Sequence, residues 1–232
     1  MVPSILAPLG SLRDLELTIL HAVNCEGESP LADTIAAFAN DPLFGIPVFL
    51  LFFLVVAASR QGRARLGRLV LAAVLGLGMG QVAVQVVWRV APRERPGKTF
   101  TEEQILRTPN RRLTCAEHPE MWVERGHPPK VPSFPSSHVM TAGAVAMVLC
   151  FGSAWVGGIA WAYALLVGFG RLYWGKHWPS DVLGSLLLAS LAGWLAWRLA
   201  GKLVPRLRRR PPVTAAPPEP FPTSPEPEVG AR

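Results

Sequence analysis

Long uncharged stretches are the feature that most constrains how this chain folds. The runs 43–59, 69–88, 139–169 and 182–197 contain no Asp, Glu, Lys or Arg. A helix of about 20 apolar residues is long enough to cross the hydrocarbon core of a bilayer. Because 50% of the residues are hydrophobic and only 17% are charged, and the apolar residues cluster into runs, the sequence predicts an all-α, polytopic membrane helical bundle.

The number of helices follows from the lengths of the runs. The stretch 139–169 is too long for one span, and Gly-Ser-Ala-Trp-Val-Gly-Gly at 152–158 is its natural turn. Leu12, Leu15 and Ile19 recur at helical spacing, which predicts an amphipathic helix at the membrane surface or against the bundle. With this N-terminal helix counted, the bundle is predicted to hold about six helices.

Clusters of arginine set the predicted topology. The formal net charge is +7, and four Arg residues fall in the short segment 60–68 while residues 202–210 form a basic tail. Such clusters beside apolar runs mark cytoplasmic segments more often than nucleic-acid-binding surfaces, so no nucleic-acid partner is predicted. Both markers give the same topology, in which the segments 89–134 and 170–181 lie on the outer face.

Three regions are predicted on this basis. Residues 1–42 form an amphipathic N-terminal helical segment. Residues 43–204 form the transmembrane core, with a long outer loop at 97–134. Residues 205–232 are basic and then rich in proline, and are predicted to be a disordered cytoplasmic tail.

The predicted topology brings four ionisable residues to one face, namely Arg95, His138, Arg171 and His177. Ionisable groups at a membrane boundary are costly and usually functional. The alternative is that they are solvated residues of loops between spans. Their convergence from three separate segments favours a functional site.

Two helices are predicted to begin on this face, each with a proline in its opening turn, Pro135 and Pro179. The first N–H groups of a helix lack intrahelical partners and carry a partial positive charge, which favours phosphate. The amides and hydroxyls of Ser136 and Ser137 are therefore candidates to hold phosphate oxygens.

Charged side chains complete this candidate anion site. Arg95 and Arg171 offer bidentate contacts to phosphate oxygens. Asp181 lies one helical turn after His177, close enough to orient its imidazole as a nucleophile or general base. With His138 as a second imidazole, one ring attacks phosphorus while the other protonates the departing oxygen, and arginines and helix ends neutralise the transition state without a metal.

These motifs resemble the type 2 phosphatidic acid phosphatases, membrane relatives of the vanadium haloperoxidases. The family signature reads Lys-x6-Arg-Pro, then Pro-Ser-Gly-His, then Ser-Arg-x5-His-x3-Asp. The matching residues are Arg95-Pro96, Pro135-Ser136-Ser137-His138, and Arg171, His177 and Asp181. The resemblance covers about residues 43–200 and implies a haloperoxidase-like helical core.

The resemblance also implies roles for the matched residues. His177 is expected to form a phosphohistidine, Asp181 to orient it, and His138 to act as general acid. No metal or other cofactor is implied. The residues expected to bind phosphate are Arg95, Ser136, Ser137 and Arg171.

Three positions depart from the signature. Trp88 stands where the family has lysine, and Arg89 or Arg93 is a candidate to replace that lysine. Ser137 stands in place of glycine, and Gly170 in place of serine, which loses a hydroxyl. None of these departures removes a catalytic group.

The resemblance predicts a lipid phosphate phosphatase of the bacterial cytoplasmic membrane, with its site facing outward. Undecaprenyl diphosphate is the expected substrate, and phosphatidylglycerophosphate or phosphatidic acid is the alternative. A phosphotransferase would share the chemistry up to the phosphohistidine. A carrier of anionic lipids would need the arginines but not the paired histidines.

Cysteine placement adds one more hypothesis. Cys25 and Cys115 both fall in polar segments that the topology places outside, where a disulfide can persist. Cys150 lies inside an apolar run and is predicted to be an inert packing residue.

Overall fold

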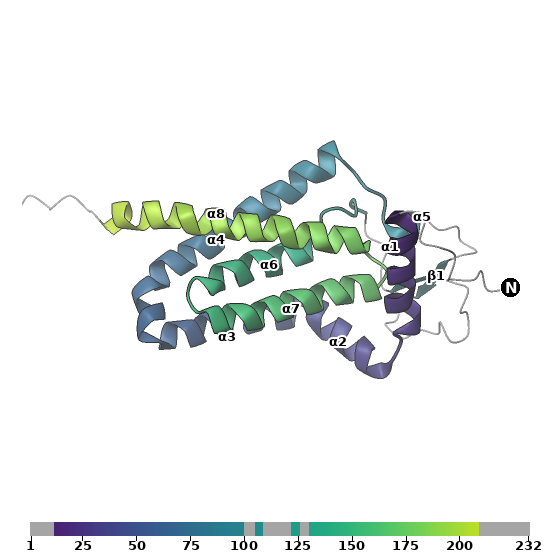
Figure 1. The fold of residues 1–232 in the computed structure, drawn as a ribbon, viewed down its shortest axis with the longest axis horizontal. Coiled ribbons are helices and arrows are strands. Elements are labelled where there is room, and N and C mark those ends of the chain that lie inside the picture. The colour runs from purple at the N-terminus through teal and green to yellow at the C-terminus, as the bar shows by residue number, and fades with distance from the viewer. Residues whose placement is uncertain (1–11, 100–104, 109–121, 126–129, 209–232) are drawn as a thin grey trace, which may run out of the picture.

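The computed structural model describes residues 12–99, 105–108, 122–125 and 130–208, and shows an elongated bundle of helices crossed at one end by a shorter helix (Figure 1). The all-α membrane bundle predicted from the sequence is confirmed. The elements in chain order are α1 (Leu12–His21), the π-helical turn η1 (Ala22–Glu26), α2 (Pro30–Asn40), α3 (Pro42–Ala58), α4 (Arg60–Val90), α5 (Pro96–Thr99), β1 (Ile105–Thr108), β2 (Trp122–Arg125), α6 (Ser137–Cys150), α7 (Ala154–Tyr173) and α8 (Pro179–Arg208).

Within the described ranges, six helices have eleven residues or more, and α1 has ten. The predicted number of about six included α1 but not α2. Helices α4, α7 and α8 are each long and apolar enough to cross a membrane. The bent pair α2–α3 adds a fourth span if its two helices are counted as one. β1 and β2 form a short parallel pair inside the predicted outer loop. The rest of that loop between 100 and 129, and the tail from residue 209, lie outside the described residues.

The arginine-rich segment 60–68, predicted to be a loop, is instead the first two turns of α4. Arg, Ala and Leu favour helix, so the segment extends the span rather than leaving it. Ser59 provides the N-cap, because its Oγ accepts the Gly62 N–H at 2.9 Å. The chain turns so tightly here that a Cβ atom on Gly62 would overlap the Val56 carbonyl oxygen.

The turn between α6 and α7 is also shorter than predicted. Helix α6 ends at Cys150, and α7 begins at Ala154 with Ser153 as its N-cap. The predicted turn at 152–158 is therefore helical from residue 154 onward. The turn was predicted too long because Gly157 and Gly158 were taken as turn residues. A Cβ atom on Gly157 would overlap Cys150, so this glycine allows the two helices to meet closely instead.

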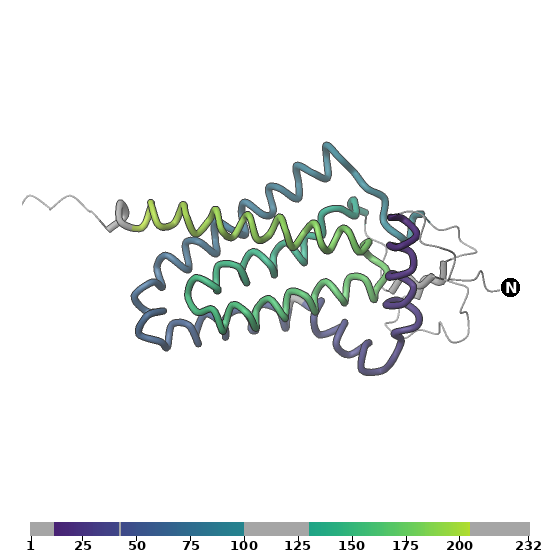
Figure 2. The backbone as a smooth tube through the Cα atoms, in the orientation of Figure 1, coloured from purple at the N-terminus to yellow at the C-terminus, as the bar shows by residue number. Residues whose placement is uncertain are grey.

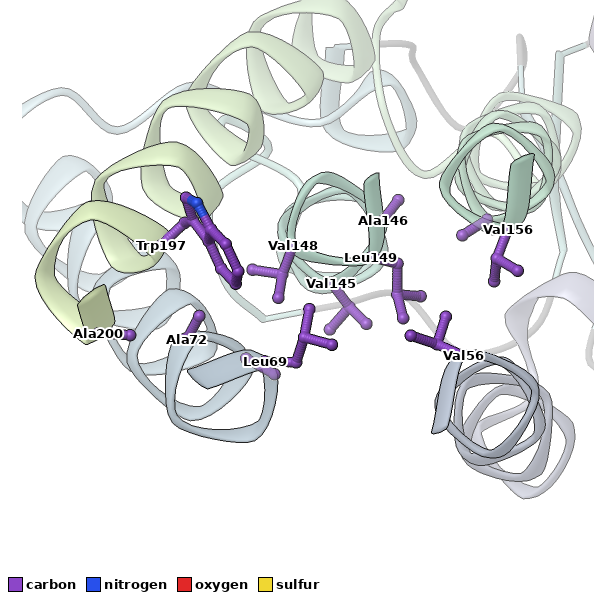
Figure 3. Packing of buried hydrophobic residues seen from close by; sticks show 12 residues of the cluster. Val56, Leu69, Ala72, Val145, Ala146, Val148, Leu149, Val156, Trp197 and Ala200 are labelled. Atoms are coloured by element: carbon purple, nitrogen blue, oxygen red, sulfur yellow. The ribbon is translucent and has the colours of Figure 1, made fainter. Parts of the chain in front are cut away.

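Helix α6 is the centre of the bundle, and it packs against α4, α7 and α8. Figure 3 shows Leu69, Val148 and Trp197 among the buried side chains where α4, α6 and α8 meet. Helices α6 and α8 approach closely at Gly143, because a Cβ atom added to Gly143 would lie only 2.8 Å from the Cβ atom of Ala189. This packing fixes the start of α6 relative to the start of α8.

The N-terminal helix lies across the end of the bundle where α7 connects to α8 (Figure 2). After it, the turn η1 is tied to α7, because Asn24 Nδ2 donates to the Tyr173 carbonyl at 2.8 Å. Cys25 is disulfide-bonded. Its predicted partner, Cys115, lies outside the described residues, and Cys150 is a free thiol.

Candidate active site

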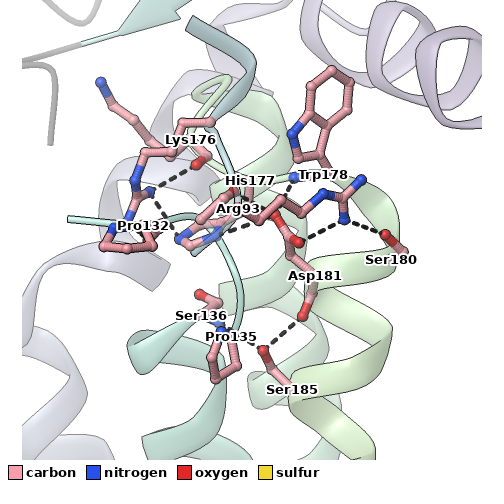
Figure 4. Close-up of polar contacts among 12 residues, drawn as sticks. Arg93, Pro132, Pro135, Ser136, Lys176, His177, Trp178, Ser180, Asp181 and Ser185 are labelled. Atoms are coloured by element: carbon pink, nitrogen blue, oxygen red, sulfur yellow. Dashed lines mark hydrogen bonds and ion pairs between the residues drawn. The ribbon is translucent and has the colours of Figure 1, made fainter. Parts of the chain in front are cut away.

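The residues singled out in the sequence gather at the end of the bundle that α1 crosses. Arg93 and Arg95 come from the link between α4 and α5, and His177 from the link between α7 and α8. Asp181 lies in the first turn of α8, and the segment that enters α6 passes beside it (Figure 4). Three segments far apart in sequence therefore build one polar cluster.

Asp181 is fully buried, and hydrogen bonds fix both of its carboxylate oxygens. Oδ1 accepts from Arg93 Nη1 at 2.8 Å. Oδ2 accepts from the backbone N–H of Trp178 at 2.9 Å and from the Ser133 hydroxyl. A buried carboxylate needs such partners, because an unpaired buried charge is strongly unfavourable.

His177 lies between this carboxylate and Arg95, and only 1% of it is exposed. Its Nδ1 is 3.8 Å from Asp181 Oδ2, which is longer than a hydrogen bond but close enough for attraction. Its Nε2 is 3.2 Å from Arg95 Nη1. A guanidinium group can only donate, so Nε2 must accept and the proton belongs on Nδ1.

The imidazole of His177 is therefore neutral, with a lone pair on Nε2. Burial, above all, lowers the pKa of His177 to about 3, and the charges of Arg171 and Arg95 act in the same direction. The nearby Asp181 opposes them but does not outweigh burial. A neutral ring at physiological pH is the form that a nucleophile requires.

Arg95 is held by three backbone carbonyls and is 4% exposed. Its Nε donates to the Val131 carbonyl at 2.8 Å and its Nη2 to the Pro132 carbonyl at 3.0 Å. Its Nη1 donates to the Lys176 carbonyl at 2.7 Å. The guanidinium thereby joins the segment before α6 to the link before α8, next to the His177 ring.

Arg171 ends α7 as a buried cation, 8% exposed. Its Nε is buried and makes no hydrogen bond to any residue in the described part of the chain. The charges of Arg171 and Arg95 act on both His138 and His177, so the two imidazoles share the same pair of cations. Buried N–H groups of this kind suit an anionic ligand.

The start of α6 differs in detail from the prediction. Ser136 is the N-cap and Ser137 the first helical residue, so Pro135 precedes the helix rather than lying in its opening turn. The Ser136 amide donates to Ser185 Oγ at 2.7 Å, which engages it within the protein. The Ser137 hydroxyl donates to Gln81 Oε1 at 3.1 Å. The first-turn amides of α6 remain oriented toward this end of the bundle, as in any helix start.

The position of the family lysine has a different role here. Trp88 Nε1 donates to the Pro135 carbonyl at 3.2 Å, so this side chain supports the segment that leads into α6. Arg93 uses both terminal nitrogens for the carboxylates of Asp181 and Glu16. Arg89 lies exposed in the last turn of α4. The replacement of the lysine by Arg89 or Arg93 therefore stays a prediction.

Gly170, which replaces the family serine, is explained by Asn40. A Cβ atom on Gly170 would overlap the Asn40 amide nitrogen, so the Asn40 side chain fills the space that serine would take. Asn40 Nδ2 donates to the Ala36 carbonyl at 2.8 Å. No pattern in the sequence pointed to Asn40, beyond its place at the break between α2 and α3.

A cavity of about 410 Å³ opens beside His138, between α3, α4, α6 and α7. Ser137, His138 and Thr141 line one part of it. The remaining lining is mostly apolar, and includes Ile46, Phe49, Leu50, Phe53, Leu77 and Val145. The cavity therefore combines a polar end at Ser137, His138 and Thr141 with an apolar groove among membrane helices.

The combination of a membrane helix bundle with a buried His–Asp pair, a second histidine and shared arginines agrees with the resemblance found in the sequence. The sequence model of the PAP2 superfamily matches residues 69–205, more than half of the chain, so the chain belongs to this family. It is a multi-pass membrane protein of that family.

Two curated proteins are similar to part of this chain. Undecaprenyl-diphosphatase BcrC of Bacillus subtilis is 40% identical over 73 residues, which is 32% of this chain and 38% of that protein. Putative undecaprenyl-diphosphatase YbjG of Escherichia coli is 36% identical over 81 residues, 33% of this chain and 41% of that protein. The chain thus spans about two-fifths of the length of these curated relatives.

A solved structure shares the fold over nearly its whole length. The crystal structure of Aquifex aeolicus LpxE matches with a TM-score of 0.55 and 23% sequence identity, over 79% of this chain and 95% of that chain. At this level of identity the likeness concerns the architecture of the bundle alone.

Proposed function

We propose that this protein is a lipid phosphate phosphatase that hydrolyses undecaprenyl diphosphate through a phosphohistidine, at the outer face of the bacterial cytoplasmic membrane. The strongest support is the cavity that reaches Ser137 and His138, because it combines this polar end with an apolar groove, and the charges of Arg171 and Arg95 act on His138. A lipid places its chain in such a groove and its phosphate at the polar end.

The choice of lipid is supported by the relatives. Two of them are named for undecaprenyl diphosphate, and their similarity to this chain falls within part of the chain only. The cavity lies between helices and is lined mostly by aliphatic and aromatic side chains, which suits a hydrocarbon chain entering from the bilayer.

In the first step, the lone pair on His177 Nε2 attacks the terminal phosphorus. A P–N bond forms and the P–O bond to the rest of the lipid breaks. His138 takes up a proton when the anionic substrate lies beside it, and this imidazolium gives the proton to the departing oxygen. Arg95 Nη1, which lies 3.2 Å from Nε2, transfers its hydrogen bond to a phosphoryl oxygen as the substrate enters. Asp181 stabilises the positive charge that develops on the His177 ring.

In the second step, water attacks the phosphorus of the phosphohistidine. His138 takes a proton from the water, and the P–N bond breaks to leave neutral His177. The products are inorganic phosphate and undecaprenyl phosphate. His138 thus serves as the acid in the first step and as the base in the second, and it ends the cycle in the protonation state in which it began.

Charge on the transferring phosphoryl group is balanced by fixed donors. The buried Arg171 Nε, Arg95 and the first-turn amides of α6 are held in place before the substrate binds. Pre-organised donors of this kind stabilise the transition state more than the ground state.

The outward orientation rests on the distribution of charge. The basic first turns of α4 and the basic end of α8 lie opposite the candidate site along the bundle. Basic ends of membrane helices face the cytoplasm. The site is then on the outer face, where a phosphatase acts on lipids of the outer leaflet.

A substrate panel with the purified full-length protein tests the proposal. Phosphate release is measured from undecaprenyl diphosphate, phosphatidylglycerophosphate and phosphatidic acid labelled in the terminal phosphate. The expected result is the highest kcat/KM for undecaprenyl diphosphate, with the label in free phosphate and an acid-labile phosphohistidine trapped at early times. Label in a second acceptor identifies a phosphotransferase instead, and no release from any lipid refutes the enzymatic assignment.

A further inference from the structure

Arg93 joins the candidate catalytic pair to the N-terminal helix. Its Nη1 is 2.8 Å from Asp181 Oδ1 and 2.6 Å from Ser180 Oγ (Figure 4). Its Nη2 is 2.7 Å from Glu16 Oε2. The side chain of Asp181 is 0% exposed and that of Glu16 is 8% exposed. One guanidinium therefore bridges two buried carboxylates, one on α8 and one on α1.

Glu16 also contacts the start of α8 directly. Its Oε1 accepts from the Ser180 backbone N–H at 3.2 Å and from the Ser180 hydroxyl. A carboxylate at the first turn of a helix satisfies an unpaired N–H and interacts favourably with the helix dipole. Glu16 thus supports the same turn of α8 that carries Asp181.

The two oxygens of Asp181 are kept apart by this arrangement. Arg93 holds Oδ1, so that Oδ2 is the oxygen that faces His177 Nδ1 at 3.8 Å. A carboxylate turns easily about its last side-chain bond, since that torsion has a broad, two-fold profile. The bond from Arg93 to Oδ1, together with the bonds from the Trp178 N–H and the Ser133 hydroxyl to Oδ2, fixes the plane of the Asp181 carboxylate.

Helix α1 also covers the residue next to His177. Trp178 is 1% exposed, its Nε1 donates to the Glu94 carbonyl at 2.9 Å, and the guanidinium carbons of Arg13 and Arg93 lie 5.4 Å and 5.5 Å from its ring centre. Cation–π contacts at these distances are attractive. The residue that follows His177 is therefore held by α1 and by the link that carries Arg93 and Glu94.

We infer that Arg93 and Glu16 are positioning residues for the Asp181–His177 pair, and that α1 is a working part of the active site. This inference rests on the proposed phosphatase function. Neither residue belongs to the three-part family signature. Arg93 sets the carboxylate that orients the nucleophile, and Glu16 holds Arg93 in place.

Charge substitutions test this inference in the purified full-length protein with undecaprenyl diphosphate. Arg93→Gln is expected to lower kcat by about 10- to 100-fold and to change KM by less than about threefold, because the nucleophile is misplaced while the phosphate donors remain. Glu16→Gln is expected to lower kcat by a smaller factor, about 3- to 10-fold. The matched controls are Glu94→Gln and Asp14→Asn, which remove exposed charges from the same segments and are expected to leave kcat unchanged.

The pH profile separates positioning from general loss of folding. The charged groups that face the pair are Arg93 at Asp181, and Arg95 and Arg171 at His177. Loss of the Arg93 cation makes protonation of the pair easier, so the acid limb of kcat/KM moves to higher pH. In Glu16→Gln, the Arg93 cation loses one of its two carboxylate partners. Its charge then acts more strongly on Asp181, so the acid limb of kcat/KM moves to lower pH. A purely structural role predicts fewer active molecules with an unshifted profile.

Arg93→Lys provides a second test in case Arg93→Gln does not fold. It keeps the charge but cannot bridge both carboxylates as a planar fork, so its kcat is expected between those of wild type and Arg93→Gln. Folded Arg93→Gln and Arg93→Lys proteins with wild-type kcat and an unshifted profile would overturn the inference. Wild-type protein that releases no phosphate from any lipid refutes the proposed function, which is a separate result.

Discussion

Arginines gather at both ends of the bundle, but they meet different partners there. At the end where α3 joins α4, Arg65 donates to the Phe151 carbonyl at 3.1 Å. Arg68 donates to the Trp197 carbonyl, and its guanidinium carbon lies 3.7 Å from the centre of the Trp197 ring. At the opposite end, Arg93 is bonded to two carboxylates and Arg95 lies against an imidazole.

Burial distinguishes arginines that anchor the ends of helices from arginines of the candidate site. Arg65 is exposed, whereas Arg95 and Arg171 are buried at 4% and 8% exposure. An exposed arginine beside carbonyls and rings secures the end of a helix at small cost. A buried arginine stays charged at a large desolvation cost, so its presence beside titratable groups indicates a role that needs the charge.

The largest contrast between the two ends is expected from removing His177, the proposed nucleophile. His177→Ala should lower phosphate release from undecaprenyl diphosphate by at least ~1000-fold, because the covalent intermediate cannot form. Arg65→Ala, at the other end, should keep kcat within about twofold of wild type. Release rates and phosphohistidine trapping are measured together. If His177→Ala kept full activity, the phosphate release would have to come from a contaminating phosphatase. The protein itself would then be better explained as a carrier of anionic lipids.

A steric test at the candidate site is expected to be next in size. Gly170→Ser should clash with Asn40 and destabilise the fold by about 1–3 kcal/mol, with loss of activity because Arg171 is the next residue. Adding Asn40→Ala frees the space and should restore part of both properties. Thermal unfolding and kcat are compared across the two single variants and the double variant. Additive losses would show that the two side chains do not share that space.

Removal of a cation from the anchoring end should change stability alone. Arg68→Gln is expected to lower the free energy of unfolding by about 1–2 kcal/mol, since it loses the contact with the Trp197 ring and carbonyl. The kcat should stay at the wild-type value. Denaturation in detergent gives the stability, and a fall in kcat without a change in stability would contradict the division of roles between the ends.

The smallest effect is a dependence of stability on pH that belongs to the candidate site. The pKa of His177 is about 3 in the folded protein against 6.5 as its ordinary value. Between these pH values the unfolded chain binds a proton that the folded protein does not, so stability falls as pH falls. From pH 6.5 to 5.5 the expected loss is about 1 kcal/mol. His177→Asn should reduce the dependence by this amount, and Arg65→Ala should leave it intact.

Much of the architecture could be predicted because it follows from local patterns. Uncharged runs gave the spans, and the helix start at Pro179 was placed correctly from proline alone. The segment 60–68 was predicted wrongly because the positive-inside rule reads charge, while helix propensity and the Ser59 cap decide its conformation. The start of α6 was misplaced because Pro135 precedes the N-cap.

Of the candidate site, only the residues that belong to the family signature could be predicted from the sequence. His138, His177, Asp181, Arg95 and Arg171 stand at recognisable spacing, and the structure brings their segments to one end of the bundle. Their partners could not be predicted, because each comes from a distant segment without a pattern of its own. These partners are Glu16, Asn40, Ser133 and Ser185.

The bond between Glu16 and Ser180 joins residues 164 positions apart. It ties the first described helix to the last helix of the bundle, so the ribosome has made nearly the whole core before the two can meet. The contact between α1 and α8 can therefore form only after the helices before α8 have been made. A growing chain then holds no completed catalytic pair, and the capacity to cleave a lipid begins only when biosynthesis of the bundle is over.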